Sequence, residues 1–241
     1  MNDIGLFETI HSSRALRRFR PDPIPDDVLV KMLDAAIRAP SAGNDQNWLF
    51  VVVKSPEQRR NIGEIYLRAG AMAASFYQRV GRPEHMSLKQ YERFANSGLY
   101  LHEHLADAPI LLLACLRLEN SLEPLTDLPR ETQLAMMNSF PWMAGASIYP
   151  AVQNIILACR ALGLGTCLTT NHMLLEDEIK QAVELPADYR TFALLPIGYP
   201  VNKFGPVNRR PLSEVVALDR FGEVPLWAKE RPQLSNSSRP R

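Results

Sequence analysis

The chain has 241 residues, of which 46% are hydrophobic and 22% are charged, and its 27 basic residues balance its 26 acidic ones. This is the composition of a water-soluble globular protein with one medium-sized domain or two small ones. A net charge of +1 argues against a general nucleic-acid surface or an acidic-membrane surface. The three cysteines, Cys115, Cys159 and Cys167, form no CxxC pair, which argues against a disulfide framework and a zinc ribbon and fits a reducing compartment.

Targeting and membrane segments are not found in the sequence. Residues 1–3 lack the basic and apolar regions of a signal peptide, and the longest apolar run, 108–116, is far shorter than the roughly 20 residues of a spanning helix. We therefore expect a cytoplasmic protein that has neither a membrane nor a nucleic acid as its partner.

The first elements are two helices separated by an extended arm. Residues 5–15 can form a short helix, which must end before the three prolines of 20–25. A clear amphipathic pattern then begins at Asp26, with Asp26 or Asp27 placed as the N-terminal cap, and stops at Pro40.

The next stretch alternates strands and capped helices. A polar turn at 41–47 leads into a β-branched and aromatic run, 48–53, which is typical of a buried strand. Ser55 and Ser87 each have the spacing of a helix N-cap, and the second of these helices should reach about His104. The apolar run 110–116 predicts a second strand.

The second half begins with a proline-containing stretch, 117–141, which reads as a long connection or lid. The segment 142–162 is apolar nearly all round, so it predicts a helix buried inside the subunit or against a second one, with a kink or new start at Pro150. Gly163 is placed as its C-terminal cap.

The last elements are two short strands, a helix and an extended end. The pattern predicts strands at 165–170 and 191–198 with a helix at 174–185 between them. Residues 200–218 read as an extended arm, and those from 228 onward have the composition of a disordered tail. Strands separated by helices favour a three-layer α/β or α+β domain.

Several familiar sites are excluded by spacing. His102 and His104 are two apart, so on a helix they cannot share one metal, and no metal site is predicted. Gly163 and Gly165 lack the third glycine of a dinucleotide fingerprint. Cys167 lies in an apolar strand, where burial would raise its pKa, so we interpret it as structural.

Positive charge gathers at both ends of the domain. Arg14 and Arg17, three apart on a short helix, would present two guanidinium groups on one face, a geometry that holds a phosphate dianion. Arg18 and Arg20 are expected at the surface, and a second cluster is Arg209-Arg210. Hydroxyl and amide groups that can read the edge of a planar ring lie at Ser41, Asn44, Gln46, Thr169 and Thr170.

Four pieces of the sequence, in this order, resemble the FMN-dependent nitroreductase superfamily. They are SRALRRFRPDPIP (13–25), RAPSAGNDQNWLFVVV (38–53), GLGTCLTT (163–170) and LLPIGYP (194–200) followed by NRRPL (208–212). The resemblance implies an α+β fold, a three-layer α/β/α sandwich of nitroreductase type. It also implies an intertwined homodimer with two FMN sites at the interface and an extended C-terminal arm around the partner. On this basis residues 1–227 form one FMN-binding domain, with 54–141 as its variable substrate-pocket or lid region, and 228–241 form the tail.

The resemblance also assigns site residues by matching positions. Arg14, Ala15 and Arg17 fall in the N-terminal FMN segment, where the arginines face the phosphate or the pyrimidine edge, and Arg209 matches a basic residue that closes on the phosphate. The remaining matches border the ribityl group or lie over the ring near N5: Ser41, Ala42, Asn44, Leu168, Thr169 and Thr170. Residues 145–150 are candidates to line the ring from the neighbouring subunit.

The sequence departs from the family pattern at three of these positions. Ser13 stands where many members have a first arginine, Ala15 where many have serine, and Asn47 where proline commonly precedes the tryptophan. The first departure slightly weakens the expected phosphate clamp. The middle region matches only vaguely, so the sequence does not identify the substrate.

The activity that the resemblance implies is an FMN-dependent oxidoreduction. NADPH or NADH would deliver a hydride to the flavin and leave, and a nitroaromatic, quinone or related small molecule would then be reduced in the same place. Positive charge near the pyrimidine edge favours the reduced flavin, which is the role expected of Arg17. The deiodinase branch of the superfamily is disfavoured because its substrate-clamping residues are not found in 54–105.

Two alternatives stay open. The protein could be a flavin-binding sensor, store or flavin-modifying protein that does not use NAD(P)H, or a cofactor-free dimeric binding module.

Overall fold

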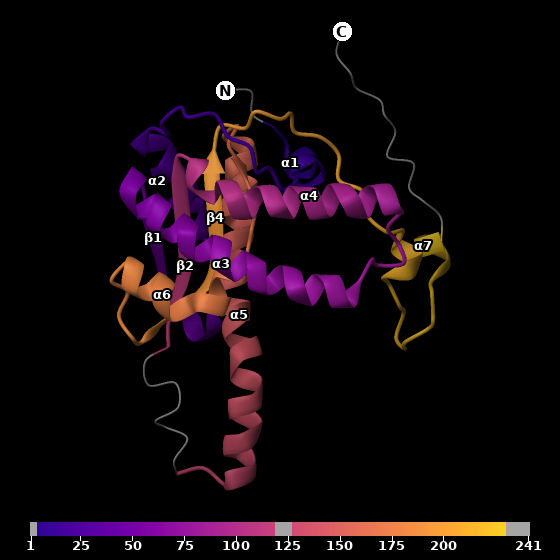
Figure 1. Ribbon diagram of the computed structural model, residues 1–241. Coiled ribbons are helices and arrows are strands. Elements are labelled where there is room, and N and C mark those ends of the chain that lie inside the picture. The colour runs from indigo at the N-terminus through magenta and orange to yellow at the C-terminus, as the bar shows by residue number, and fades with distance from the viewer. Residues whose placement is uncertain (1–3, 119–126, 230–241) are drawn as a thin grey trace. The chain divides into compact units, whose positions relative to one another are not determined.

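The computed structural model describes residues 4–118 and 127–229, and it divides the chain into two compact units, Met1–Gly205 and Pro206–Arg241. In the first unit a four-stranded antiparallel sheet with the order β1-β2-β4-β3 lies between helices (Figure 1). The strands are β1 (Trp48–Val53), β2 (Ile110–Arg117), β3 (Gly165–Thr166) and β4 (Tyr189–Gly198). The predicted strands 48–53, 110–116 and 191–198 are therefore confirmed.

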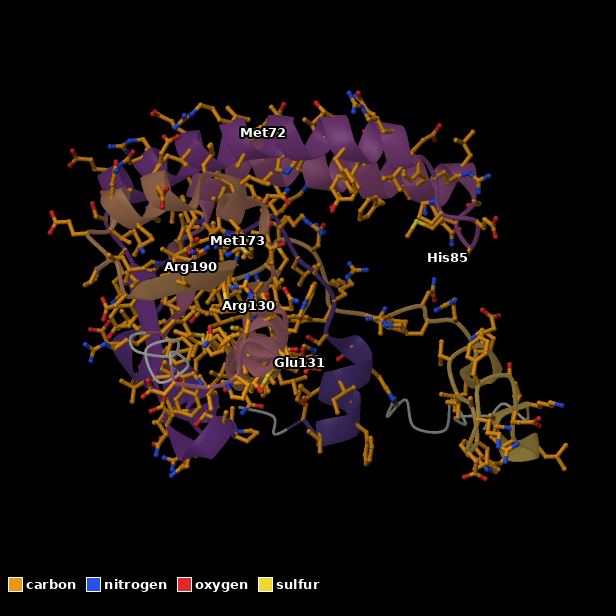
Figure 2. The ribbon with its side chains drawn as sticks, turned by 90° about the horizontal axis from the view of Figure 1, so that it is seen from below. Met72, His85, Arg130, Glu131, Met173 and Arg190 are labelled. Atoms are coloured by element: carbon orange, nitrogen blue, oxygen red, sulfur yellow. The ribbon has the colours of Figure 1, made fainter. Side chains whose placement is uncertain are left out.

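The two faces of β2 carry two separate cores. Leu112 and Leu116 point to one side, where they pack with α2 (Asp26–Ala36) and α5 (Arg130–Ala161). Leu111 and Leu113 point to the other side, towards α3 (Pro56–Val80) and α4 (Leu88–His104). Because successive side chains of a strand alternate, one apolar run serves both layers. The three-layer α+β sandwich predicted from the sequence is confirmed, and Figure 2 shows helices on both sides of the sheet.

Short helices complete the first unit. They are α1 (Leu6–Ser12), α6 (Glu176–Ala182) and the 3-10 turns η1 (Ala42–Asn44), η2 (Leu105–Asp107) and η4 (Asn171–Leu175). The second unit contains η5 (Leu212–Glu214) and α7 (Leu226–Lys229). Most of the predicted tail, 228–241, lies outside the described residues, and its first two residues end α7.

Three of the four helix caps predicted from the sequence are confirmed. The Ser55 hydroxyl accepts from Gln58 N, Ser87 and Gln90 form a capping box, and Gly163 has the positive φ of 77° expected after α5. The cap predicted at Asp26 or Asp27 is wrong, because Pro25 occupies the N-cap position of α2. The two aspartates lie in the first turn instead.

Other boundaries differ from the predictions for local reasons. The expected connection 117–141 becomes helical at Arg130, and α5 continues through Pro141 and Pro150, since a proline removes one hydrogen bond but its φ is compatible with a helix. The predicted helix 174–185 ends by Ala182, and Glu184 takes a positive φ of 51°.

The predicted strand 165–170 is interrupted. Gly165 and Thr166 form the ladder with β4. After a gap, Thr169 pairs with Leu194 as an isolated bridge in the same register. The segment therefore stays at the edge of the sheet.

Candidate functional site

The N-terminal segment that follows α1 lies along the edge of the sheet. Leu16 N–H donates to the carbonyl of Thr166, Arg20 N–H donates to that of Tyr199, and Phe19 pairs with Pro200. This close approach depends on Gly198, because a Cβ there would lie 2.7 Å from Pro109 Cδ and 2.9 Å from Phe19 Cβ. The strand end thus holds the arginine-rich residues 14–18 next to 165–170.

A basic pocket of about 420 Å³ lies between this segment and α4. Its lining residues are Arg14, Ala15, Leu16, Arg17, Arg18, Arg93, Asn96, Ser97, Tyr100 and Asn202. The structure thus brings Arg14, Ala15 and Arg17 together as the sequence predicts, although they lie in an extended segment and not on a helix, since α1 ends at Ser12. Arg18, expected at the surface, also lines the pocket.

Neutral groups position three of the four guanidinium groups. Arg17 Nη1 donates to Ser97 Oγ at 3.0 Å, and Arg14 Nη2 donates to the Lys203 carbonyl at 2.8 Å. The Arg18 guanidinium lies 3.7 Å above the centroid of the Tyr100 ring. Among the described residues no carboxylate pairs with Arg14, Arg17, Arg18 or Arg93, and the buried Nε of Arg17 has no partner there. The pocket therefore has cationic donors ready for an anion.

The segment 168–170 borders the same region. Burial raises the pKa of Tyr66 to about 12 and that of Cys167 to about 11, and the charge of Arg17 opposes both rises, which places Arg17 close to them. The Thr169 hydroxyl is turned into the core, where it is hydrogen-bonded to Tyr66 OH at 2.7 Å. Leu168 and Thr170 on either side of it are exposed, so they are the members of this segment that a ligand can reach.

The loop with Ser41, Ala42 and Asn44 is held by α5. Ala42 N–H donates to Ser147 Oγ at 3.1 Å, and Ser41 Oγ accepts from Gln46 N–H. Asn44 has a positive φ of 56°, a conformation that asparagine tolerates better than most residues.

This loop lies at the opposite end of the sheet from the basic pocket. It precedes Trp48, which pairs with Leu116, and Leu116 pairs in turn with Arg190 near the start of β4. The N-terminal segment meets β4 beyond its other end, at Pro200. At about 3.3 Å per residue, the strand from Arg190 to Pro200 spans roughly 30 Å. Within one chain, the predicted cofactor-binding residues therefore lie in two separate sets, one at each end of the sheet.

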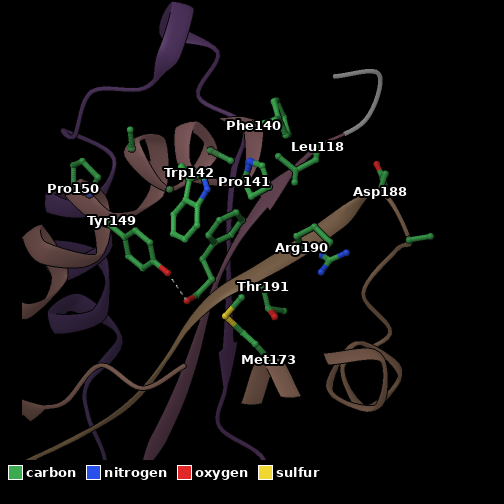
Figure 3. Close-up of a pocket in the computed structure, with 15 residues that line it drawn as sticks. Leu118, Phe140, Pro141, Trp142, Tyr149, Pro150, Met173, Asp188, Arg190 and Thr191 are labelled. Atoms are coloured by element: carbon green, nitrogen blue, oxygen red, sulfur yellow. Dashed lines mark hydrogen bonds between the residues drawn. The ribbon is translucent and has the colours of Figure 1, made fainter. Parts of the chain in front are cut away.

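A second, mostly apolar pocket of about 950 Å³ lies between α5 and β4 (Figure 3). It includes Gly145, Ala146, Tyr149 and Pro150, which fall within the stretch 145–150 singled out in the sequence. Tyr149 OH donates to the Phe192 carbonyl at 3.3 Å, and burial raises the pKa of this phenol, so it stays protonated.

Arg190, which also lines the apolar pocket, is not a free cation. Its Nη2 lies 2.7 Å from Glu176 Oε2, and Glu176 also accepts from the backbone and hydroxyl of Thr191. Because this buried carboxylate is satisfied, we interpret the cluster as structural.

Arg209 belongs to the second unit, where its Nη1 donates to the Asn208 carbonyl. Its predicted role at the phosphate remains a prediction. The α4 residues of the basic pocket were not predicted from the sequence. Their spacing, 93, 96, 97 and 100, is that of one helix face and was the available signal.

Within residues 4–118 and 127–229 no group of three or more histidine, cysteine or acidic side chains is arranged to hold a metal ion. In the same ranges, no helix has the length and hydropathy needed to span a membrane.

Comparison with known proteins identifies similar chains. The profile of the Nitroreductase family matches residues 10–199. An NADH dehydrogenase of Thermus thermophilus is 28% identical over 221 residues, which cover 84% of this chain and 90% of that protein. A 5,6-dimethylbenzimidazole synthase of Rhodospirillum rubrum is 30% identical over 229 residues, which cover 95% and 91%.

Solved structures agree with these matches. The BluB-like flavoprotein of Clostridium difficile superposes with a TM-score of 0.66 at 26% identity, over 90% of this chain and 100% of the other. Iodotyrosine deiodinases are also among the similar proteins, at identities from 23% to 27%. Chains similar to this one therefore carry several different activities.

Proposed function

Since this chain belongs to the nitroreductase family, we propose that it is an FMN-dependent oxidoreductase that takes a hydride from NADPH or NADH and reduces a small organic acceptor, such as a nitroaromatic or a quinone. The observation that carries the proposal is the basic pocket, where four guanidinium groups converge and none has a carboxylate partner among the described residues. A phosphate monoester is the anion whose charge and oxygen geometry fit such donors.

The residues fit FMN in their chemistry. Arg14 and Arg17 would face the phosphate or the pyrimidine edge of the flavin, and the Nε of Arg17, which has no partner among the described residues, is a donor that bound FMN would satisfy. Leu168 and Thr170 would lie against the ring, with Thr169 held behind them by Tyr66. Bound FMN supplies the hydride-accepting atom, N5, and the protein supplies placement and positive charge.

We also propose a homodimer, in which each site takes one set of residues from each subunit. Arg14, Ala15 and Arg17 lie at one end of the sheet and Ser41, Ala42 and Asn44 at the other, so a second copy can bring the two sets together. On α5, Trp142 is 82% exposed and Met143 is 53% exposed. Exposed apolar side chains of this kind are typical of an interface.

A mixing experiment tests this arrangement. Arg17→Ala and Asn44→Gly each remove a donor from one set, and glycine keeps the positive φ that Asn44 requires. We expect each variant alone to lose FMN. Co-refolded together, they should regain about a quarter of the sites, because one site of each mixed dimer is intact.

The matched control mixes Arg17→Ala with Arg14→Ala, two changes in the same set, and should regain no sites. Recovery in neither mixture would show that each site is built from one chain.

The first test of the activity is an anaerobic titration of the FMN-loaded protein with NADPH and with NADH. We expect one or both nucleotides to bleach the visible absorbance of the oxidised flavin, since the flavin accepts the hydride. A bound flavin that neither nucleotide reduces would instead favour a sensor, storage or flavin-modifying role. That second candidate is kept because the similar proteins include a 5,6-dimethylbenzimidazole synthase, whose name describes a synthesis and not the reduction of an acceptor by NAD(P)H. Failure to bind flavin would refute both.

A further inference from the structure

One face of α4 forms a wall of the basic pocket. Arg93, Asn96, Ser97 and Tyr100 follow the spacing of adjacent helix turns, so their side chains share that face, and all four line the pocket. The opposite wall is the N-terminal segment. Two chain regions more than seventy residues apart in sequence therefore surround the same anion site.

Several residues of the N-terminal wall offer an anion no free side-chain hydrogen-bond donor, or have donors that are already engaged. Ala15 lines the pocket but has no hydrogen-bonding side chain, and the side chain of Leu16 is buried. Arg14 donates to the Lys203 carbonyl, and the Arg18 guanidinium lies over the Tyr100 ring. Arg17 is tied to Ser97 across the pocket. The other donor side chains that line the pocket are Asn202 and residues of α4.

Arg93 is the cation that α4 adds. No hydrogen bond or ion pair ties it to another of the described residues, so its five N–H donors are available. A guanidinium fork can bind two oxygens of one phosphate through two parallel N–H donors, a planar geometry that the ammonium group of a lysine does not have. We propose that Arg93 is a ligand of the phosphate group of FMN in this protein, and the inference rests on the proposed function.

This contact ties α4 to the bound cofactor. The capping box at Ser87 fixes the start of α4, and Leu101 and Leu105 anchor its other end in the core next to α3. A phosphate held between Arg93 and Arg17 would join this helix to the N-terminal segment. The variable region of the domain then contributes to cofactor binding as well as to the substrate pocket.

The test compares FMN with riboflavin, which lacks the phosphate. Both are titrated into flavin-free full-length protein, and the dissociation constants are read from flavin fluorescence. Arg93→Ala should weaken FMN binding about tenfold and leave riboflavin binding unchanged, since only FMN carries the charge that Arg93 meets. The FMN affinity of Arg93→Lys should lie between those of the wild type and Arg93→Ala, because lysine keeps the positive charge but lacks the fork of two parallel donors.

Lys89→Ala is the matched control. Lys89 is an exposed cation one turn earlier on the same helix and does not line the pocket, so its removal should leave the ratio of the two constants as in the wild type. Because Arg93 is itself exposed, neither change disturbs the core.

The assignment of Arg93 would be overturned by a ratio in Arg93→Ala equal to that of the wild type, whether both flavins keep their affinity or lose it equally. A loss of NADPH but not NADH reduction beside that unchanged ratio would assign Arg93 to the dinucleotide. A wild-type protein that binds neither flavin would refute the proposed function and, with it, this inference.

Discussion

Replacing Arg17 by alanine is expected to weaken FMN binding about a hundredfold, or about 3 kcal/mol, the loss typical of a partly buried charge-assisted contact. Arg17 lines the basic pocket. One of its nitrogens is fixed by Ser97, its Nε is buried without a partner among the described residues, and its charge acts on both Tyr66 and Cys167. Its removal also leaves Ser97 without that donor. Equilibrium titration of the flavin-free protein with FMN measures the change.

Arg20→Ala is the control for that experiment. Arg20 lies in the same segment, but it pairs with Asp22 at 3.5 Å and does not line the pocket, so its loss should leave FMN affinity unchanged. Equal FMN affinity in Arg17→Ala and the wild type would remove Arg17 from the cofactor site.

Acidification from pH 7 to pH 5 is expected to lower the free energy of unfolding by about 2 kcal/mol through His172 alone. This residue is fully buried in η4, and neither ring nitrogen has a partner among the described residues. Burial lowers its pKa from 6.5 to about 4. As the pH falls below 6.5, the unfolded chain binds a proton that the folded protein excludes, so the stability held above that pH is lost towards pH 4.

Urea unfolding at several pH values measures this effect. His172→Leu removes the ionisable group and should flatten the dependence between pH 7 and pH 5. His85→Leu, which removes an exposed histidine, should keep the wild-type slope. A His172→Leu protein that still loses the same stability would show that other groups cause the dependence.

The sequence alone predicted most of the local structure. The apolar runs at 48–53 and 110–116 became strands, and the caps at Ser55, Ser87 and Gly163 formed, because these signals depend on neighbouring residues only. It also predicted the α+β sandwich and the family. The phosphate-binding role of Arg14 and Arg17 stays a prediction, although both line one pocket.

Other features depended on tertiary contacts. The inward turn of Thr169 depends on Tyr66, which is more than one hundred residues away. No local pattern predicts such a partner.

Tertiary contacts also determined which residues line the basic pocket. Arg18 and Arg93 were not predicted as site residues, and they become part of the pocket only because α4 packs alongside the N-terminal segment. The separation of Arg17 from Asn44 follows from the strand order and register. The sequence determined which residue types and local elements are present, while the tertiary structure decided which charges meet, since burial and proximity are properties of the packed chain.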